Sequence, residues 1–104
     1  MKQFTIIVKP FRAEAVLQAI TERGGDACVV TEAKGYRRQK GYLDRYLGSE
    51  YSLAFLPKVV INVWVDDDRA DEVATRIAKI ARTGRIGDGK LFVMPMSWGE
   101  PIEF

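Results

Sequence analysis

The sequence of 104 residues predicts an α+β fold whose strands and helices follow one another in the order βαββαβ. Four short runs are rich in β-branched and aromatic residues, which favour strands. Two longer segments repeat apolar residues at the i, i+3, i+4 and i+7 spacing of an amphipathic helix. A chain of this length corresponds to one domain, residues 1–104, with one hydrophobic core.

The first half of the pattern is strand, helix, strand. Residues 4–8 are expected to form the first strand, which Pro10 ends. Gly24 and Gly25 are a natural stop for the helix that follows, and residues 28–36 are expected to form the second strand. The apolar stripe of this helix comprises Ala13, Val16, Leu17 and Ile20.

The second half repeats the pattern. The apolar run 59–65 predicts a third strand that is buried on both faces. Residues 66–68, three aspartates, suit the start of a helix because they supply a cap and a charge that complements the helix dipole. Residues 91–94 are expected to form the fourth strand. The apolar stripe of this helix comprises Ala70, Val73, Ala74, Ile77 and Ala81.

The complete order is the ferredoxin-like arrangement, an antiparallel sheet with both helices on one face. The other face has no helix to cover it, although the sequence places apolar residues there. A sheet face of this kind usually meets a partner. Trp64 and the third strand therefore predict oligomerisation.

A long stretch between Tyr36 and Pro57 fits no regular element, and we assign a loop to residues 37–56. Loops of this length in compact domains are usually functional. All four tyrosines of the chain fall between residues 36 and 51, together with a cluster of basic residues. Aromatic and cationic residues together are typical of contact surfaces. The plainer interpretation is a solvated excursion with a few packed aromatic residues.

The run 83–90, with the sequence TGRIGDGK, indicates a phosphate-binding loop. Glycine allows backbone N–H groups to turn toward an anion, and Lys90 adds a positive charge. The spacing approaches the P-loop pattern, but Leu91 stands where a Ser or Thr would hold Mg²⁺, and the run connects a helix to a strand. We therefore predict nucleotide phosphate binding without P-loop NTPase activity. The alternative is a turn with no ligand.

Composition disfavours several other classes of function. The single cysteine, Cys28, excludes an internal disulfide framework. Without histidine, both a transition-metal site within one chain and histidine-based catalysis are disfavoured. No apolar run approaches the roughly 20 residues of a membrane span, and no signal peptide is visible. The formal net charge of +2 says little about partners.

With these pieces placed, the chain resembles the P-II signal-transduction family of nitrogen regulators. The resemblance covers residues 1 to about 96, and residues 97–104 are unlike the family. The segments that carry it are 7–11 (IVKPF), 31–36 (TEAKGY), 38–41 (RQKG), Tyr46, Gly48, 50–51 (EY), 55–59 (FLPKV) and 83–93 (TGRIGDGKLFV).

The resemblance implies a cytoplasmic, non-catalytic homotrimer with nucleotide clefts between subunits. ATP and ADP compete there, and 2-oxoglutarate binds beside Mg-ATP. The long loop then changes shape and controls an enzyme of nitrogen or carbon metabolism or a membrane transporter. A membrane is reached only through such a transporter, and nucleic acid is not an expected partner.

The resemblance also implies roles for single residues. Lys58 would pair with the distal carboxylate of 2-oxoglutarate, and Gln39 would ligate Mg²⁺. Tyr51 takes a loop-tip position that some members uridylylate, although a tyrosine in a docking loop also serves as an anchor. The implied 2-oxoglutarate residues are Gln39, Lys40, Gly41 and Lys58. The implied nucleotide-binding residues are Gly35, Arg37, Arg38, Gln39, Asn62, Trp64, Gly87, Asp88, Gly89 and Lys90.

The chain departs from the family pattern near the nucleotide. Arg37 stands where the family usually has glycine, Val29 replaces a threonine that helps to hold adenine, and Asn62 replaces a glutamate. Segment 97–104 lacks the arginines that reach the terminal phosphates of a neighbouring site. We therefore expect ADP, or even AMP, to bind at least as tightly as ATP without 2-oxoglutarate. Whether 2-oxoglutarate or another small anion is the second effector stays open.

The main alternative is a ferredoxin-like nucleic-acid-binding module. The RNA recognition motif has the same βαββαβ order and uses strand aromatics with basic residues. Against this interpretation, Tyr36 is followed by Arg37 and Arg38, not by the aromatic strand of that motif. An enzyme that uses residues 66–68 to bind a metal is disfavoured, because consecutive side chains point in different directions.

Overall fold

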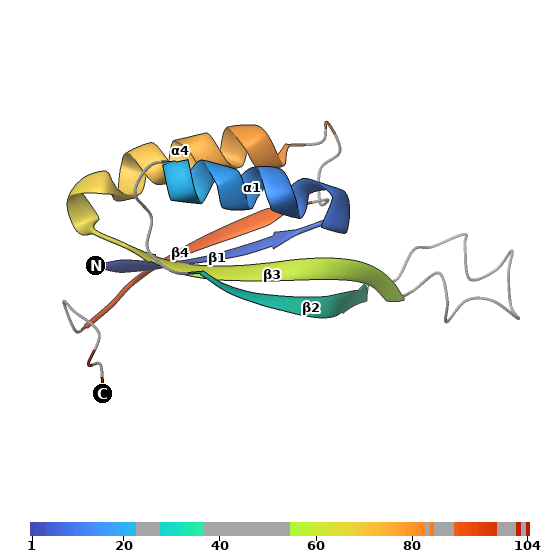
Figure 1. Ribbon diagram of the computed structural model, residues 1–104, viewed down its shortest axis with the longest axis horizontal. Helices are drawn as coiled ribbons and strands as arrows, with labels where there is room; N and C mark the ends of the chain where they lie inside the picture. Colours follow the sequence, from blue (N-terminus) through green and yellow to red (C-terminus); the bar gives the residue numbers. More distant parts are fainter. Residues whose placement is uncertain (23–27, 37–54, 83, 85–88, 98–101, 103) are drawn as a thin grey trace, which may run out of the picture.

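The structure, a computed structural model, describes residues 1–22, 28–36, 55–82, 84, 89–97, 102 and 104. The elements are β1 (Lys2–Val8), α1 (Pro10–Glu22), β2 (Val29–Tyr36), β3 (Phe55–Val65), the 3-10 helix η1 (Asp67–Arg69), α4 (Ala70–Ala81) and β4 (Lys90–Pro95). The predicted order βαββαβ is confirmed, and both helices lie on one side of the sheet (Figure 1).

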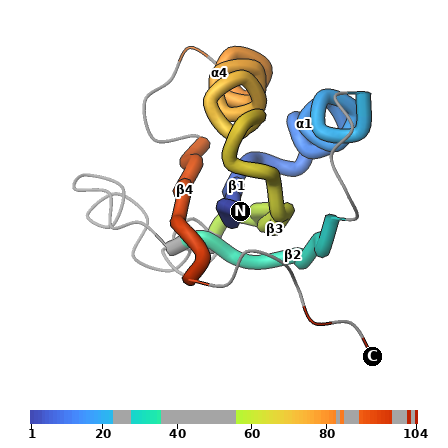
Figure 2. The backbone as a smooth tube through the Cα atoms, turned by 90° about the vertical axis from the view of Figure 1, so that its left-hand side faces the viewer, coloured from blue at the N-terminus to red at the C-terminus, as the bar shows by residue number. Residues whose placement is uncertain are grey.

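The four strands form one antiparallel sheet in the order β2-β3-β1-β4. β1 is an inner strand, with β3 on one side and β4 on the other. Figure 2 shows α1 and α4 side by side over the same face of this sheet. The ferredoxin-like arrangement is therefore present, and neither of the described helices lies over the opposite sheet face.

The core lies between the two helices and the sheet. Alternate residues of β1 from Phe4 and of β3 from Val59 point into it, and both predicted helix stripes contribute to it. Phe4, Ile61 and Ile77 are fully buried at its centre. The core cluster comprises Phe4, Ile6, Val8, Val16, Ile20, Ile61, Val63, Val65, Ala70, Val73 and Ile77.

The predicted burial of residues 59–65 on both faces is wrong for the single chain. Ile61, Val63 and Val65 are buried beneath the helices, whereas Val60 and Trp64 on the opposite face are half-buried. The apolar run thus serves the core with one face and leaves apolar side chains accessible on the other.

The three aspartates begin a helix as predicted, with Asp67 and Asp68 in the first turn of η1, but the predicted side-chain cap is wrong. Asp66 occupies the N-cap position of η1 but makes no side-chain capping hydrogen bond, and α4 begins later, at Ala70. Asp71 and Glu72, in the first turn of α4, supply the charge that complements the helix dipole. Asp67 instead pairs with the amino group of Met1, at 3.0 Å between nitrogen and Oδ1.

β3 begins at Phe55, so the predicted loop 37–56 is too long at its C-terminal end. Residues 55–58 pair with residues 33–36 of β2, while β1 ends at Val8 opposite Val59. We call these two paired segments the β2–β3 ribbon. Pro57 lies beyond the end of β1, where none of the described strands pairs with β3 on that side, and an unpaired strand edge is where a sheet accommodates proline.

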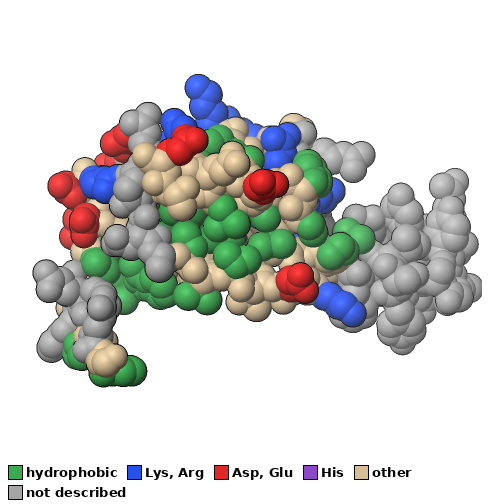
Figure 3. All heavy atoms as spheres, in the orientation of Figure 1, with side chains coloured by type: hydrophobic (Ala, Val, Ile, Leu, Met, Phe, Trp, Pro, Cys, Tyr) green, Lys and Arg blue, Asp and Glu red, His purple; other side chains and the backbone are tan. Residues whose placement is uncertain are grey.

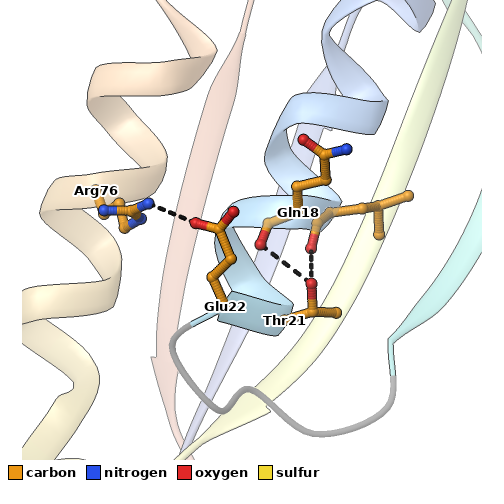
Figure 4. A network of polar contacts seen from close by, with 5 residues as sticks. Gln18, Thr21, Glu22 and Arg76 are labelled. Atoms are coloured by element: carbon orange, nitrogen blue, oxygen red, sulfur yellow. Dashed lines mark hydrogen bonds and ion pairs between the residues drawn. The ribbon is translucent and has the colours of Figure 1, made fainter.

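An ion pair connects the two helices. Arg76 Nη2 of α4 lies 2.8 Å from Glu22 Oε2 in the last turn of α1, and Figure 4 shows the two side chains reaching toward each other. A carboxylate at a helix C-terminus interacts unfavourably with the helix dipole, so the arginine offsets that cost. Neither described helix has the length and apolarity that crossing a lipid bilayer requires.

Candidate functional site

The described candidate residues on β3 and β4 lie on the sheet face that the helices do not cover, which we call the bare face. Phe4, Ile6 and Val8 point toward the helices, so the alternate residues of β1 point away from them. Directly paired residues share a face of the sheet. The register pairs Gln3 with Trp64, Thr5 with Asn62, and Ile7 with Lys90. Asn62, Trp64 and Lys90 are therefore all on the bare face.

The bare face is apolar over much of its area. Val29, Phe92 and Met94 are 52%, 49% and 40% exposed, and Val60 and Trp64 are half-buried. From the side, hydrophobic side chains reach the surface along the sheet layer, below the charged side chains of the helix layer (Figure 3). Apolar faces of this kind usually meet a partner, and oligomerisation stays a prediction from the sequence.

Lys58 crosses the β2–β3 ribbon on the bare face. A Cβ atom built on Gly35 would lie 3.0 Å from Lys58 Cγ and 3.2 Å from Lys58 Cε. The half-buried alkyl chain of Lys58 therefore lies over Gly35, where a larger residue would obstruct it. This path carries the ammonium group along the ribbon toward Tyr36, the last residue of β2.

The end of the glycine-rich run lies beside the end of β1. A Cβ atom on Gly89 would lie 3.6 Å from the Ile7 carbonyl oxygen and 3.7 Å from the Ala81 carbonyl oxygen, which are ordinary contact distances. Gly84 has a φ of 87°, a backbone conformation that glycine adopts without strain. Of the described residues of the run, Gly84 follows α4, Gly89 lies beside β1, and Lys90 begins β4 and is exposed.

Lys58 and Lys90 lie at the same end of the bare face. Lys90 pairs with Ile7, Ile7 pairs with Val60, and Lys58 is the next residue beyond Val60 on this face of β3. Two strand spacings of about 4.8 Å each separate the two strands. Two cations at one end of a face whose other described side chains are apolar or uncharged favour an anion there.

Asn62 belongs to a chain of hydrogen bonds in the middle of the bare face. Gln3 Nε2 donates to Thr5 Oγ1 at 3.3 Å, and Thr5 Oγ1 donates to Asn62 Oδ1 at 2.7 Å. All three side chains are half-buried. Neither Gln3 nor Thr5 was predicted as a site residue, although their alternation with Phe4 and Ile6 in the first strand places them on the bare face.

The structure also settles some local chemistry. Burial raises the pKa of the Cys28 thiol, immediately before β2. Within the described part of the chain, His, Cys, Asp and Glu side chains do not gather into a group that could hold a metal ion.

Eight of the predicted site residues lie outside the described residues, and they are Arg37, Arg38, Gln39, Lys40, Gly41, Tyr51, Gly87 and Asp88.

Residues 1–100 match the family described as "Nitrogen regulatory protein P-II". The chain is 52% identical to nitrogen regulatory protein GlnK of Escherichia coli K12 over 93 residues, which cover 89% of this chain and 83% of that protein. It is 50% identical to nitrogen regulatory protein P-II of Mesorhizobium japonicum, with the same coverage. It is 47% identical over 96 residues to nitrogen regulatory protein P-II of Azospirillum brasilense, covering 92% and 86%.

Proposed function

Because the chain belongs to the nitrogen regulatory protein P-II family and is therefore a non-catalytic signal-transduction protein of nitrogen regulation, we propose that it binds ATP and ADP in clefts between copies of the chain. Mg²⁺ and 2-oxoglutarate join ATP in the same cleft. The nucleotide state then controls how residues 37–54 engage a target. The target is an enzyme of nitrogen or carbon metabolism or a membrane transporter, in the cytoplasm.

The convergence of Lys58 and Lys90 at one end of the bare face supports this proposal. Phosphates and carboxylates are anions, and a lysine ammonium offers each of them a point charge with several donors. Lys90 is the phosphate ligand in the proposal, and Lys58 is the ligand of the 2-oxoglutarate carboxylate. The path of Lys58 over Gly35 carries its charge toward residues 37–41, which follow β2 in the sequence.

The other ligands in the proposal complete the site around this pair. Asn62 and Trp64 contact the nucleoside, the latter through its backbone, and Gln39 supplies an amide oxygen to Mg²⁺, a donor type that this ion accepts. The residues proposed to hold phosphate are Arg37, Arg38, Gly87, Asp88, Gly89 and Lys90, with Gly35 beside them. Those proposed to hold 2-oxoglutarate are Gln39, Lys40, Gly41 and Lys58.

The bare face supports a homotrimer in the proposal. Phe92 and Met94 on β4 and Val29 on β2 are exposed in the single chain. Burial of such side chains against other copies is favourable by about 25 cal/mol per Å² of apolar area. Static light scattering at micromolar concentration without ligand tests the assembly. A monomer under those conditions would contradict the proposed trimer and the nucleotide cleft between its copies.

Nucleotide preference tests the site itself. Segment 97–104 contains Glu100 and Glu103 and no cation, and a carboxylate near the terminal phosphate opposes the extra charge of ATP. In calorimetric titrations without 2-oxoglutarate, ADP or AMP should therefore bind at least as tightly as ATP. A tenfold preference for ATP, about 1.4 kcal/mol, would contradict this expectation.

The second effector and the modification each have a direct test. Titration of 2-oxoglutarate into the protein with Mg-ATP should release or absorb heat. The absence of a heat signal at millimolar 2-oxoglutarate would favour another small anion near Arg37.

Tyr51 is the proposed uridylylation site. Incubation with a matched uridylyltransferase should add the mass of one uridylyl group, and an unchanged mass beside a modified control relative would favour an anchor role.

A further inference from the structure

All three methionines of the chain lie at one end of the bare face. The register pairs Gln3 with Met94, and the Met96 amide donates to the Met1 carbonyl oxygen at 3.1 Å, which extends the same pairing beyond β4. Met1 therefore lies opposite Met96, and Met94 lies two positions away on the same side of the strand. The N-terminus and the end of β4 lie far from the β2–β3 ribbon (Figure 1), so this end is opposite to the one with the two lysines.

The surroundings of these methionines suit a cation. Met94 and Met96 are exposed, so an ion in solution can reach them, whereas the Met1 side chain is only 11% exposed. The Met1 amino group lies 3.0 Å from Asp67 Oδ1, and this carboxylate offsets the positive charge nearest to the methionines. Trp64 is diagonal to Met1 across β1 and β3, a separation that an aromatic side chain can bridge.

The shared chemistry of the cluster is thioether sulfur, a soft and uncharged ligand that selects Cu(I) over Mg²⁺ and Ca²⁺. Cβ atoms of directly opposite residues are roughly 4.5–5.5 Å apart, and the three rotatable bonds of methionine allow neighbouring sulfur atoms to converge on one ion. The chain has no histidine, and its single cysteine packs against the core. A metal ion at this end of the bare face would therefore be held by thioethers, without imidazole or thiolate.

From this arrangement we infer that Met1, Met94 and Met96 form a site for a soft monovalent cation, Cu(I) or its analogue Ag(I). The indole of Trp64 adds the attraction of an aromatic face for a cation. The site goes beyond the proposed function and does not depend on the nucleotide site, which lies at the other end of the face. A thioether has no proton to lose, so the affinity of this site does not change with pH, unlike that of a thiolate or imidazole site.

Calorimetric titration of Ag(I) in chloride-free buffer tests the inference. The parent protein is the Cys28→Ser variant, which lacks the competing thiol, and it should bind one ion per chain. Met94→Leu and Met96→Leu, made in this parent, should each weaken binding by about tenfold or more, because loss of even a residue that supports a metal ligand costs roughly 10–100-fold. Leucine nearly conserves the volume of methionine. Phe92→Leu, on the same face of β4, is the matched control and should bind like the parent.

Two measurements on the parent protein do not depend on the methionine variants. The Ag(I) affinity should stay constant from about pH 6 to pH 8, whereas a site with ionisable ligands would weaken as the pH falls. X-ray absorption of the Cu(I) complex, kept reduced with ascorbate, should show sulfur as the neighbour of copper. A first shell of nitrogen or oxygen would overturn the inference.

Other results would also overturn the site. With no Ag(I) binding, the methionines serve only apolar contacts of the bare face. One ion per three chains would mean that the site is not built within one chain. Equal Ag(I) affinity of both methionine variants and the Phe92→Leu control would place the ion elsewhere, and Zn²⁺ binding as tight as that of Ag(I) would exclude a site made of soft thioethers.

Discussion

The alkyl chain of Lys58 lies across Gly35, so close that a Cβ atom there would be 3.0 Å from Lys58 Cγ. Glycine at this position therefore has a packing role, because it makes room for a neighbouring side chain. The lysine that the proposal assigns to 2-oxoglutarate owes its direction to this missing side chain.

Gly35→Ala should weaken 2-oxoglutarate binding in the presence of Mg-ATP by about fivefold, roughly 1 kcal/mol, because the methyl group displaces the Lys58 chain. The free energy of unfolding should change little, since the close atoms belong to a flexible side chain. Thr31→Ala, at an exposed position on the same face of β2, is the matched control. Calorimetric titration measures both variants, and equal affinities for the two would contradict the packing role.

Lys90→Ala should weaken ADP binding by about 1.5–3 kcal/mol, the range for a hydrogen bond to a charged group. Lys79→Ala removes the same charge from an exposed position on α4, and we expect it to bind ADP normally. The comparison separates a local contact from a change in net charge. Unchanged isotherms for Lys90→Ala would remove this lysine from the site.

Ile77→Ala should lower the free energy of unfolding by about 2–5 kcal/mol, because a fully buried side chain leaves a cavity in the core. Ile80→Ala, at a partly buried position on the same helix, should cost less. Urea unfolding at one fixed protein concentration measures both, which keeps any contribution from assembly constant. A larger loss for Ile80→Ala would mean that the core is not centred where the structure places it.

The ion pair between Arg76 and Glu22 should contribute about 0.2–1 kcal/mol, because both side chains are partly accessible to solvent. A double-mutant cycle with Arg76→Gln and Glu22→Gln, measured by denaturant unfolding, gives the coupling energy. The coupling should shrink in 1 M salt, where screening acts over about 3 Å. A coupling that salt leaves unchanged would indicate that water does not reach this pair.

Burial raises the pKa of the Cys28 thiol, so the folded state favours its protonated form. This contribution to stability is complete below the pKa of the unfolded chain, about 8.5, and is lost as the pH rises through the folded pKa. The unfolding free energy of the wild type should therefore fall relative to that of Cys28→Ser as the pH rises above about 8.5. A constant difference over this range would show that the thiol titrates alike in both states.

Much of the fold was predictable because each element carries its own periodicity. Phe4, Ile6 and Val8 alternate as a half-buried strand should, and Val73 and Ile77 recur at helical spacing. The start of β3 was not predictable, because Pro57 normally indicates a break. That proline fits only because β1 has already ended, and the position of this end depends on the pairing of distant segments.

Less of the candidate site than of the fold was predictable from the sequence. Sequence motifs identified Lys58 and Lys90 as candidate site residues. Their position at the same end of one sheet face, however, follows from the register of the strands. Thr5 was missed for the same reason, since its bond to Asn62 spans 57 positions of sequence. The alternation of residues along one strand indicates on which face of the sheet a side chain lies. Its neighbours on that face depend on the order and register of the strands.

The pairing of Tyr36 with Phe55 closes the β2–β3 ribbon, and the chain departs from the fold and rejoins it at this one pair. The 18 residues in between, 37–54, belong to neither strand, so the pairing of β2 with β3 is complete without them. Sequence changes confined to residues 42–54 therefore leave both this strand pairing and the proposed ligands in 37–41 in place.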